Sequence, residues 1–100
     1  MTKEDILKVL KEKKEFLQEK YQVKKIGLFG SYVRDEATDK SDIDIYAVFP
    51  EANWDNTAGL WNYLEKIYGK KVDLLREYEK GVKQKPSAIK EEILKEVIFI

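Results

Sequence analysis

The chain has 100 residues, which is the size of one small domain, so we expect a single domain over residues 1–100. It has 19 Lys and Arg against 19 Asp and Glu, and this zero net charge argues against direct binding to nucleic acid. Cysteine and histidine are absent, which excludes disulfides, thiolate sites and Ser-His-Asp triads. Any metal must therefore be held by oxygen ligands, which favours Mg²⁺ or Mn²⁺. The first residues are charged and no apolar run is long enough to span a membrane, so we expect a cytoplasmic protein.

The first elements are predicted by their hydrophobic spacing. Residues 3–20 carry apolar side chains at helical spacing, with Thr2 as N-cap and Asp5 completing a weak capping box. Residues 25–29 are predicted to form a short strand, residues 31–36 a short helix, and residues 37–41 a polar loop.

Residues 42–49 are predicted to form a strand, with Ile43, Ile45, Ala47 and Phe49 on one face and the residues between them on the other, and Pro50 is expected to end it. A helix is predicted over residues 56–68, with Gly69 just beyond its end. A third strand over 71–75, a helix over 86–95 and a short strand over 97–100 follow, whereas residues 77–85 have no clear pattern. The last segment either pairs as an edge strand or docks on another subunit.

The most specific pattern is Gly30-Ser31 followed, after ten residues, by Asp42-Ile43-Asp44. Asp42 and Asp44 leave the same face of one strand, where their repulsion would be relieved by a divalent cation. Gly30 would let a phosphate approach the backbone, and Ser31 would offer its hydroxyl at the start of the short helix. Arg34, one turn later, could also reach a phosphate.

These residues form one site only if the first two strands are antiparallel. A third strand parallel to the second would bring Asp73 to the same edge as a third carboxylate, and three carboxylates suit a two-metal transfer site. The sequence therefore predicts an α/β fold (α+β by some schemes): a small mixed sheet of three core strands, with a C-terminal strand as a candidate edge, covered by helices.

Some of these residues have simpler explanations. Asp73 could be an edge charge, and Arg34 could be a solvated surface residue. Trp54 and Trp61 fit packing better than base stacking. Tyr32 and Tyr46 could line a nucleotide pocket or pack in the core.

Residues 25–49 resemble the minimal nucleotidyltransferases of the DNA polymerase β superfamily, which are often the antitoxins of HEPN/MNT toxin–antitoxin pairs. The resemblance extends to residues 71–75 and to the last helix. It implies the nucleotidyltransferase fold, ATP as substrate, Mg²⁺ (or Mn²⁺), and transfer of a nucleoside monophosphate to a hydroxyl. In the antitoxin members that hydroxyl is implied to belong to a tyrosine of a partner HEPN ribonuclease.

Carried over by position, the resemblance implies that Gly30 and Ser31 hold phosphate and that Asp42 and Asp44 hold metal, with Asp73 as the third catalytic and metal-binding carboxylate. Many relatives have glycine directly after the motif arginine, where this chain has Asp35. If that position needs a positive φ, aspartate adopts it less readily than glycine.

We therefore expect a Mg²⁺-dependent nucleotidyltransferase that acts as an antitoxin on a HEPN-domain partner, in a homo- or hetero-oligomer. After the catalytic core little sequence is left for an acceptor-binding domain, which disfavours transfer to RNA or to a small molecule. The alternative is a non-catalytic binding module that neutralises its partner by contact.

Overall fold

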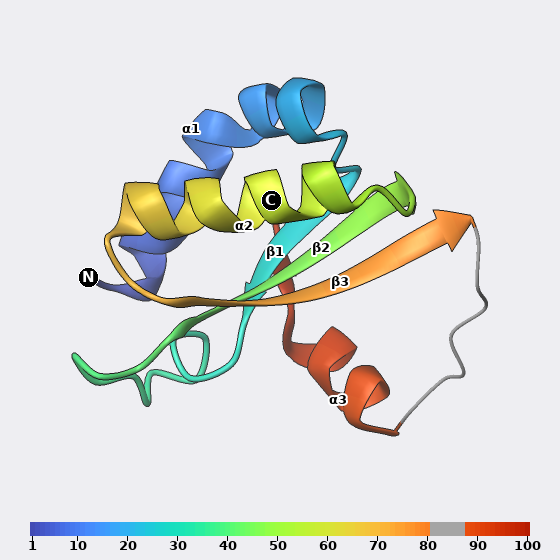
Figure 1. Cartoon of the computed structure of the whole chain (residues 1–100). Coiled ribbons are helices and arrows are strands. Elements are labelled where there is room, and N and C mark those ends of the chain that lie inside the picture. Colours follow the sequence, from blue (N-terminus) through green and yellow to red (C-terminus); the bar gives the residue numbers. More distant parts are fainter. Residues whose placement is uncertain (81–87) are drawn as a thin grey trace.

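The computed structural model describes residues 1–80 and 88–100, which form a mixed sheet between two layers of helices (Figure 1). The elements follow in the order α1 (Lys3–Tyr21), β1 (Lys25–Phe29), β2 (Ile43–Glu51), α2 (Trp54–Tyr68), β3 (Val72–Lys80), α3 (Ala88–Glu96) and β4 (Ile98–Phe99). The strand order is β3-β2-β1-β4, with β2 antiparallel to β1 and parallel to β3. The predicted mixed α/β fold is confirmed. Among the described residues, no helix is both long enough and apolar enough to cross a bilayer.

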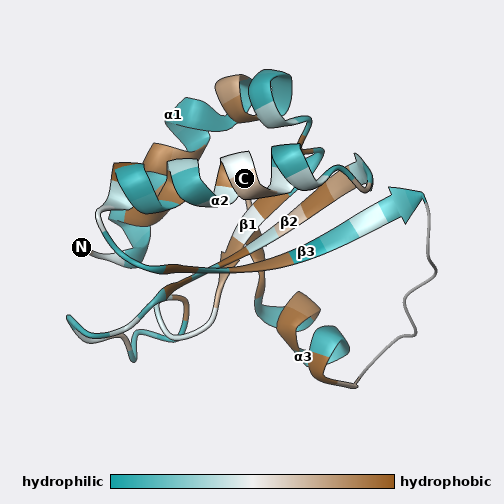
Figure 2. Cartoon of the chain, viewed as in Figure 1, coloured by the Kyte–Doolittle hydropathy of each residue, from teal (hydrophilic) through white to brown (hydrophobic). Residues whose placement is uncertain are grey.

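The two faces of the sheet are covered unequally. Helices α1 and α2 lie on one face and α3 on the other (Figure 1). The predicted alternation of β2 is confirmed, because the first face holds the buried side chains of Ile43, Ile45, Ala47 and Phe49. The second face has a smaller apolar cluster of Phe29, Tyr46 and Val48, against which Ile93 and Val97 pack. Figure 2 shows apolar residues along β1, β2 and the first half of β3, whereas the end of β3 is hydrophilic.

The helix ends follow local sequence signals. At α1, the Thr2 amide donates to Asp5 Oδ2 (2.9 Å) and the Asp5 amide donates to Thr2 Oγ1 (3.2 Å), so the predicted capping box is present. Helix α2 begins at Trp54, earlier than expected, because the Asn53 side chain caps it by accepting the Asn56 amide at 3.0 Å. Gly69 ends α2 in a left-handed conformation, as expected.

Strands β2 and β3 both run further than the sequence predicted. β2 continues through Pro50 to Glu51, whereas we expected it to stop at Phe49. The last residue that β1 pairs is Val48, and the register with β3 skips Pro50, so the missing amide hydrogen interrupts neither ladder. β3 continues to Lys80 because it follows the lengthened β2 in parallel register.

The C-terminal elements return the chain to the sheet beside β1. The predicted start of the last helix, at Pro86 and Ser87, lies outside the described residues, and α3 is seen from Ala88 onward. β4 pairs antiparallel with β1 at Gly27 and Leu28, which confirms the edge-strand alternative.

The segment after β1 is a hydrogen-bonded turn, which corrects the predicted short helix over residues 31–36. The Glu36 amide donates to the Ser31 carbonyl (2.9 Å) and the Asp35 amide to the Tyr32 carbonyl (3.4 Å). Asp35 has φ 59°, so the turn closes with the left-handed residue that typically ends a helix. The positive φ that the sequence raised as a question at Asp35 is therefore present.

This conformation predicts opposite effects for two substitutions. We expect Asp35→Gly to leave the free energy of unfolding unchanged or raised by up to about 1 kcal/mol, because glycine adopts positive φ without strain. Asp35→Val should lower it by about 1–2 kcal/mol. Urea denaturation measures both. The ion pair of Asp35 with Lys3 is 3.9 Å long and exposed, so its loss contributes little to either value. Equal effects of the two substitutions would contradict a conformational cause.

Candidate active site

The sheet register brings the residues of the sequence motif together. Phe29 pairs with Asp44, so Gly30 and Ser31 follow directly beside that carboxylate. On the other side of β2, Asp44 lies opposite Asp73 in the parallel register of β3. Asp42 lies just before β2 with the same strand parity as Asp44. The predicted juxtaposition of the glycine-serine corner with the three carboxylates is therefore what the structure shows.

The position of the Asp44 carboxylate requires glycine at position 30. Its φ is +82°, and a Cβ on Gly30 would lie 2.0 Å from Asp44 Oδ2. The Ser31 backbone amide also faces the Asp44 carboxylate and acts to lower its pKa. The sequence explained Gly30 by close approach of a phosphate, whereas the structure shows that the group against this glycine is the carboxylate of Asp44.

The Asp44 carboxylate lies in an electrostatically unfavourable place. Its pKa is raised mainly because the group is partly buried, and further because the negative charges of Asp73 and Asp42 are close. The Ser31 amide and the positive charge of Arg34 act in the opposite direction. Asp42 and Asp73 are exposed. The site thus concentrates negative charge at one edge of the sheet.

Hard oxygen donors of this kind suit Mg²⁺ or Mn²⁺. Within residues 1–80 and 88–100, however, no three acidic side chains converge closely enough to form a metal site unaided. A cation at Asp42 and Asp44 would therefore need oxygen ligands beyond these side chains, from water or from a bound phosphate group.

Arg34 is held by two glutamates. Its Nη1 lies 3.0 Å from both carboxylate oxygens of Glu96, and its Nε lies 3.2 Å from Glu36 Oε2. Hydrogen bonds to these carboxylates, that of Glu96 above all, raise the pKa of Arg34, so the side chain stays a cation. Glu96 Oε1 also accepts the Gly30 amide at 3.0 Å.

Sequence reasoning missed Glu96. It lies 62 residues from Arg34 and ends α3, and no motif contains it. The one available signal is its position, because a carboxylate in the last turn of a helix is unfavourable next to the negative end of the helix dipole.

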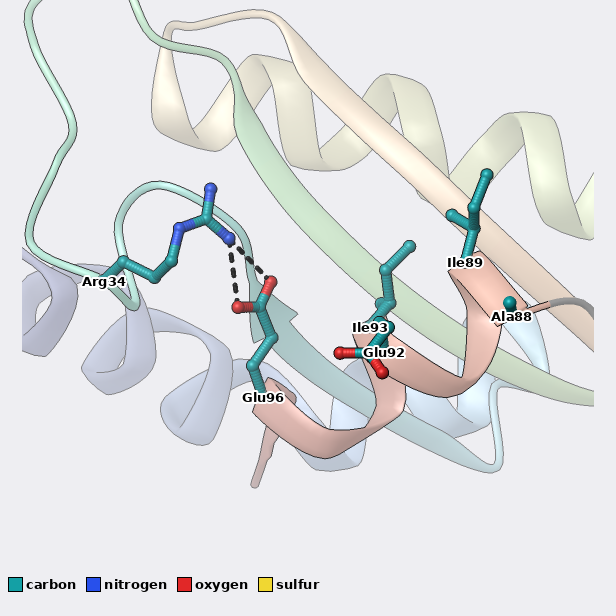
Figure 3. A pocket seen from close by; sticks show the side chains of 6 residues that line it. All are labelled: Arg34, Ala88, Ile89, Glu92, Ile93 and Glu96. Carbon is teal, nitrogen blue, oxygen red and sulfur yellow. Dashed lines mark hydrogen bonds and ion pairs between the residues drawn. The ribbon is translucent and has the colours of Figure 1, made fainter.

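A cavity of about 450 Å³ borders Arg34 and runs along α3 (Figure 3). Its apolar wall comes from Ile89 and Ile93, and its polar rim from Arg34, Glu92 and Glu96.

The aromatic residues near the motif mostly serve packing. Tyr32 is 6% exposed in the main core, and the buried Tyr46 donates its hydroxyl to Glu77. Trp61 is partly buried and donates Nε1–H to the Val72 carbonyl at 2.7 Å. Trp54 is 64% exposed, so packing was the wrong expectation there. Its ring lies on the surface, with the Arg76 guanidinium 5.8 Å from the ring centre.

Comparisons with known proteins point in one direction. The family model described as "Nucleotidyltransferase domain" matches residues 10–100. Protein adenylyltransferase MntA of Thermococcus cleftensis is 38% identical over 101 residues, which cover 100% of this chain and 97% of the relative. A candidate protein adenylyltransferase of Methanocaldococcus jannaschii is 41% identical over 97 residues, which cover 96% and 95%.

Solved structures agree in fold. A candidate minimal nucleotidyltransferase superposes with a TM-score of 0.67 at 27% identity, covering 98% of this chain and 95% of that one. A chain from a mutant of the toxin–antitoxin complex MntA-HpeT gives a TM-score of 0.62 at 18% identity, over 88% and 69% of the two chains, which shows likeness of fold alone.

The repulsion at Asp44 predicts a gain in stability when its charge is removed. We expect Asp44→Asn to raise the free energy of unfolding at pH 7 by up to about 1 kcal/mol after solvent screening. The side-chain oxygen of the asparagine can still face the Ser31 backbone amide as a hydrogen-bond acceptor. Asp39→Asn, in the exposed loop, is the control and should change little.

The pH dependence has a definite sign. The folded protein holds the Asp44 proton more tightly than the unfolded chain does, so this group favours folding below its ordinary pKa near 4. That contribution falls as pH rises through the raised folded pKa. Urea denaturation across this range should show the decline in wild type and a smaller one in Asp44→Asn. A lower stability of the variant at pH 7 would contradict the repulsion.

The contact between Gly30 and Asp44 can be separated from the cost of positive φ. Gly69 has φ +63°, but a Cβ there would meet no atom within 4 Å. Gly69→Ala should therefore cost about 1 kcal/mol for backbone strain alone, and Gly30→Ala about 2–4 kcal/mol because the Asp44 carboxylate must also move. Equal losses in urea denaturation would show that the Gly30–Asp44 contact is unimportant.

Proposed function

Because the chain belongs to the nucleotidyltransferase domain family, we propose that it transfers AMP from ATP to a hydroxyl of a partner protein, with Mg²⁺ (or Mn²⁺) as the metal. The observation that carries the proposal is the meeting of Asp42, Asp44 and Asp73 beside the Gly30-Ser31 corner. A protein acceptor is supported by the MntA relative, whose name is protein adenylyltransferase and which matches the whole chain.

In this proposal the carboxylates of Asp42 and Asp44, with that of Asp73, hold the metal. A divalent cation bound there supplies charge neutralisation for the triphosphate and the leaving group. The Gly30 amide already binds Glu96, and the Ser31 amide faces the carboxylate of Asp44. The phosphate contacts therefore fall to the Ser31 hydroxyl and to the guanidinium of Arg34.

The transfer exchanges one bond for another. The acceptor oxygen bonds to the α-phosphorus of ATP, and the bond from that phosphorus to the oxygen bridging the β-phosphate breaks, so pyrophosphate leaves. The acceptor proton passes to the Asp73 carboxylate, which is exposed on the outermost strand and open to an approaching protein.

We assign the acceptor as a tyrosine of a HEPN-domain toxin and the chain as its antitoxin. The support is the name of the MntA relative, together with a fold shared with a chain of the MntA-HpeT toxin–antitoxin complex. The two proteins would then form at least a transient hetero-oligomer.

A second function is neutralisation by contact, without chemistry. The observation that favours it is that the Gly30 amide and two of the three guanidinium nitrogens of Arg34 already bond to carboxylates of the chain itself. The two functions differ in whether ATP is needed and whether the partner is changed covalently.

The deciding experiment incubates the chain with a candidate HEPN partner, ATP and Mg²⁺, followed by mass spectrometry and a ribonuclease assay after the proteins are separated. We expect the partner to gain the mass of one or more AMP groups and to remain inactive. The Asp42→Asn/Asp44→Asn double variant should lose transfer by at least about a thousandfold. Asp39→Asn is the control for loss of a nearby charge. If the double variant protects as well as wild type and adds no mass, the chain acts by contact and the proposal is wrong.

A further inference from the structure

We infer that Glu96 is a positioning residue that holds Arg34 and the Gly30-Ser31 corner in the arrangement that receives the triphosphate. This inference rests on the proposed function and adds to it a residue of the C-terminal helix.

Glu96 joins the two groups with one carboxylate. Oε1 accepts the Gly30 amide and Arg34 Nη1, each at 3.0 Å, and Oε2 accepts the same Nη1 at 3.0 Å. Gly30 belongs to the corner against which the Asp44 carboxylate lies. A displacement of Glu96 would therefore free the Gly30 amide beside the acidic cluster and leave Arg34 held by Glu36 alone.

The hydrogen bonds of Arg34 leave part of the guanidinium available. Nε is used by Glu36 and Nη1 by Glu96, whereas Nη2 has no hydrogen bond to any residue in the ranges 1–80 and 88–100. Figure 3 shows the second terminal nitrogen of Arg34 pointing away from Glu96. A guanidinium fixed on two sides loses less conformational freedom when its remaining N–H groups bind a phosphate.

The burial of Glu96 fits this role. Its side chain is 26% exposed, whereas that of Glu92, one turn earlier on α3, is 74% exposed and pairs with Lys95 on its own helix. Glu96 is also placed at the helix end that disfavours a negative charge. The contacts with Arg34 and Gly30 offset that disadvantage and attach the end of α3 to the site.

The location allows a ligand to reach Arg34 while Glu96 stays in place. Arg34 and Glu96 lie at one end of the cavity along α3, so the open side of the guanidinium is reached without separating the pair. Val97, the next residue, packs against the cluster of Phe29, Tyr46 and Val48, which anchors the end of the helix to the sheet.

The test measures the dissociation constant of Mg·ATP by calorimetry for wild type, Glu96→Ala, Glu96→Gln and Glu91→Ala. Loss of the carboxylate in Glu96→Ala should weaken binding about tenfold or more. Glu96→Gln keeps one acceptor oxygen and should lie between Glu96→Ala and wild type. Glu91→Ala removes an exposed charge from the same helix and should bind like wild type. The binding of tripolyphosphate, used as a second probe, should weaken in parallel, because Glu96 affects the binding of the phosphate groups of ATP.

A double-mutant cycle tests whether Glu96 acts through Arg34. In an Arg34→Ala background, Glu96→Ala should weaken binding much less than it does in wild type. Melting temperatures check that each variant is folded, and Glu96→Gln keeps the test valid if Glu96→Ala is unstable.

Two outcomes overturn the inference alone: wild-type affinity in Glu96→Ala, or tighter binding, which would make Glu96 a competitor of the phosphates. Failure of wild type itself to bind Mg·ATP overturns the proposed function and this inference with it. The two failures are distinguished by the wild-type measurement.

Discussion

The carboxylate of Asp44 lies directly against the Cα of Gly30, and the rest of the candidate site is arranged around this contact. It requires a residue without Cβ immediately after β1, because a Cβ would overlap Oδ2, and the positive φ of Gly30 favours glycine independently. It also requires β2 to be antiparallel to β1, so that Asp44 pairs with Phe29. The parallel β3 then places Asp73 on the other side of Asp44. Three acidic residues are thereby brought close although their charges repel.

The same corner is contacted from the other side by the C-terminal helix. Asp44 faces the Ser31 amide from the sheet, and Glu96, from α3, accepts the Gly30 amide while holding Arg34. Arg34, the cation that the sequence predicted for the site, is therefore held by its neighbour Glu36 and by Glu96, which is distant in the chain. Backbone amides and the guanidinium of Arg34 face these carboxylates and partly offset their negative charge. This explains how a small chain can hold several acidic side chains at one edge of its sheet.

Local signals in the sequence predicted much of this structure. The capping box at Thr2, the buried face of β2 and the left-handed Gly69 depend on neighbouring residues, and all three are found. The antiparallel β1–β2 pair and the parallel β2–β3 pair were predicted by assuming that the motif residues form one site. The extension of β2 past Pro50 depends on pairing with β3, and the turn in place of a short helix depends on its backbone hydrogen bonds. A local sequence pattern does not contain this information. Glu96 could not be found because its contacts with Gly30 and Arg34 join residues more than 60 positions apart.

The central claim is that the acidic cluster beside Gly30 and Ser31 receives a metal-bound nucleoside triphosphate. Its most direct test is a crystal structure with Mn²⁺ and a non-hydrolysable ATP analogue, in which anomalous scattering locates the metal. The account predicts a manganese peak at the carboxylates of Asp42 and Asp44, with the triphosphate next to Ser31 and Arg34. A well-ordered analogue bound elsewhere, or bound at the corner with no manganese at these carboxylates, would contradict it.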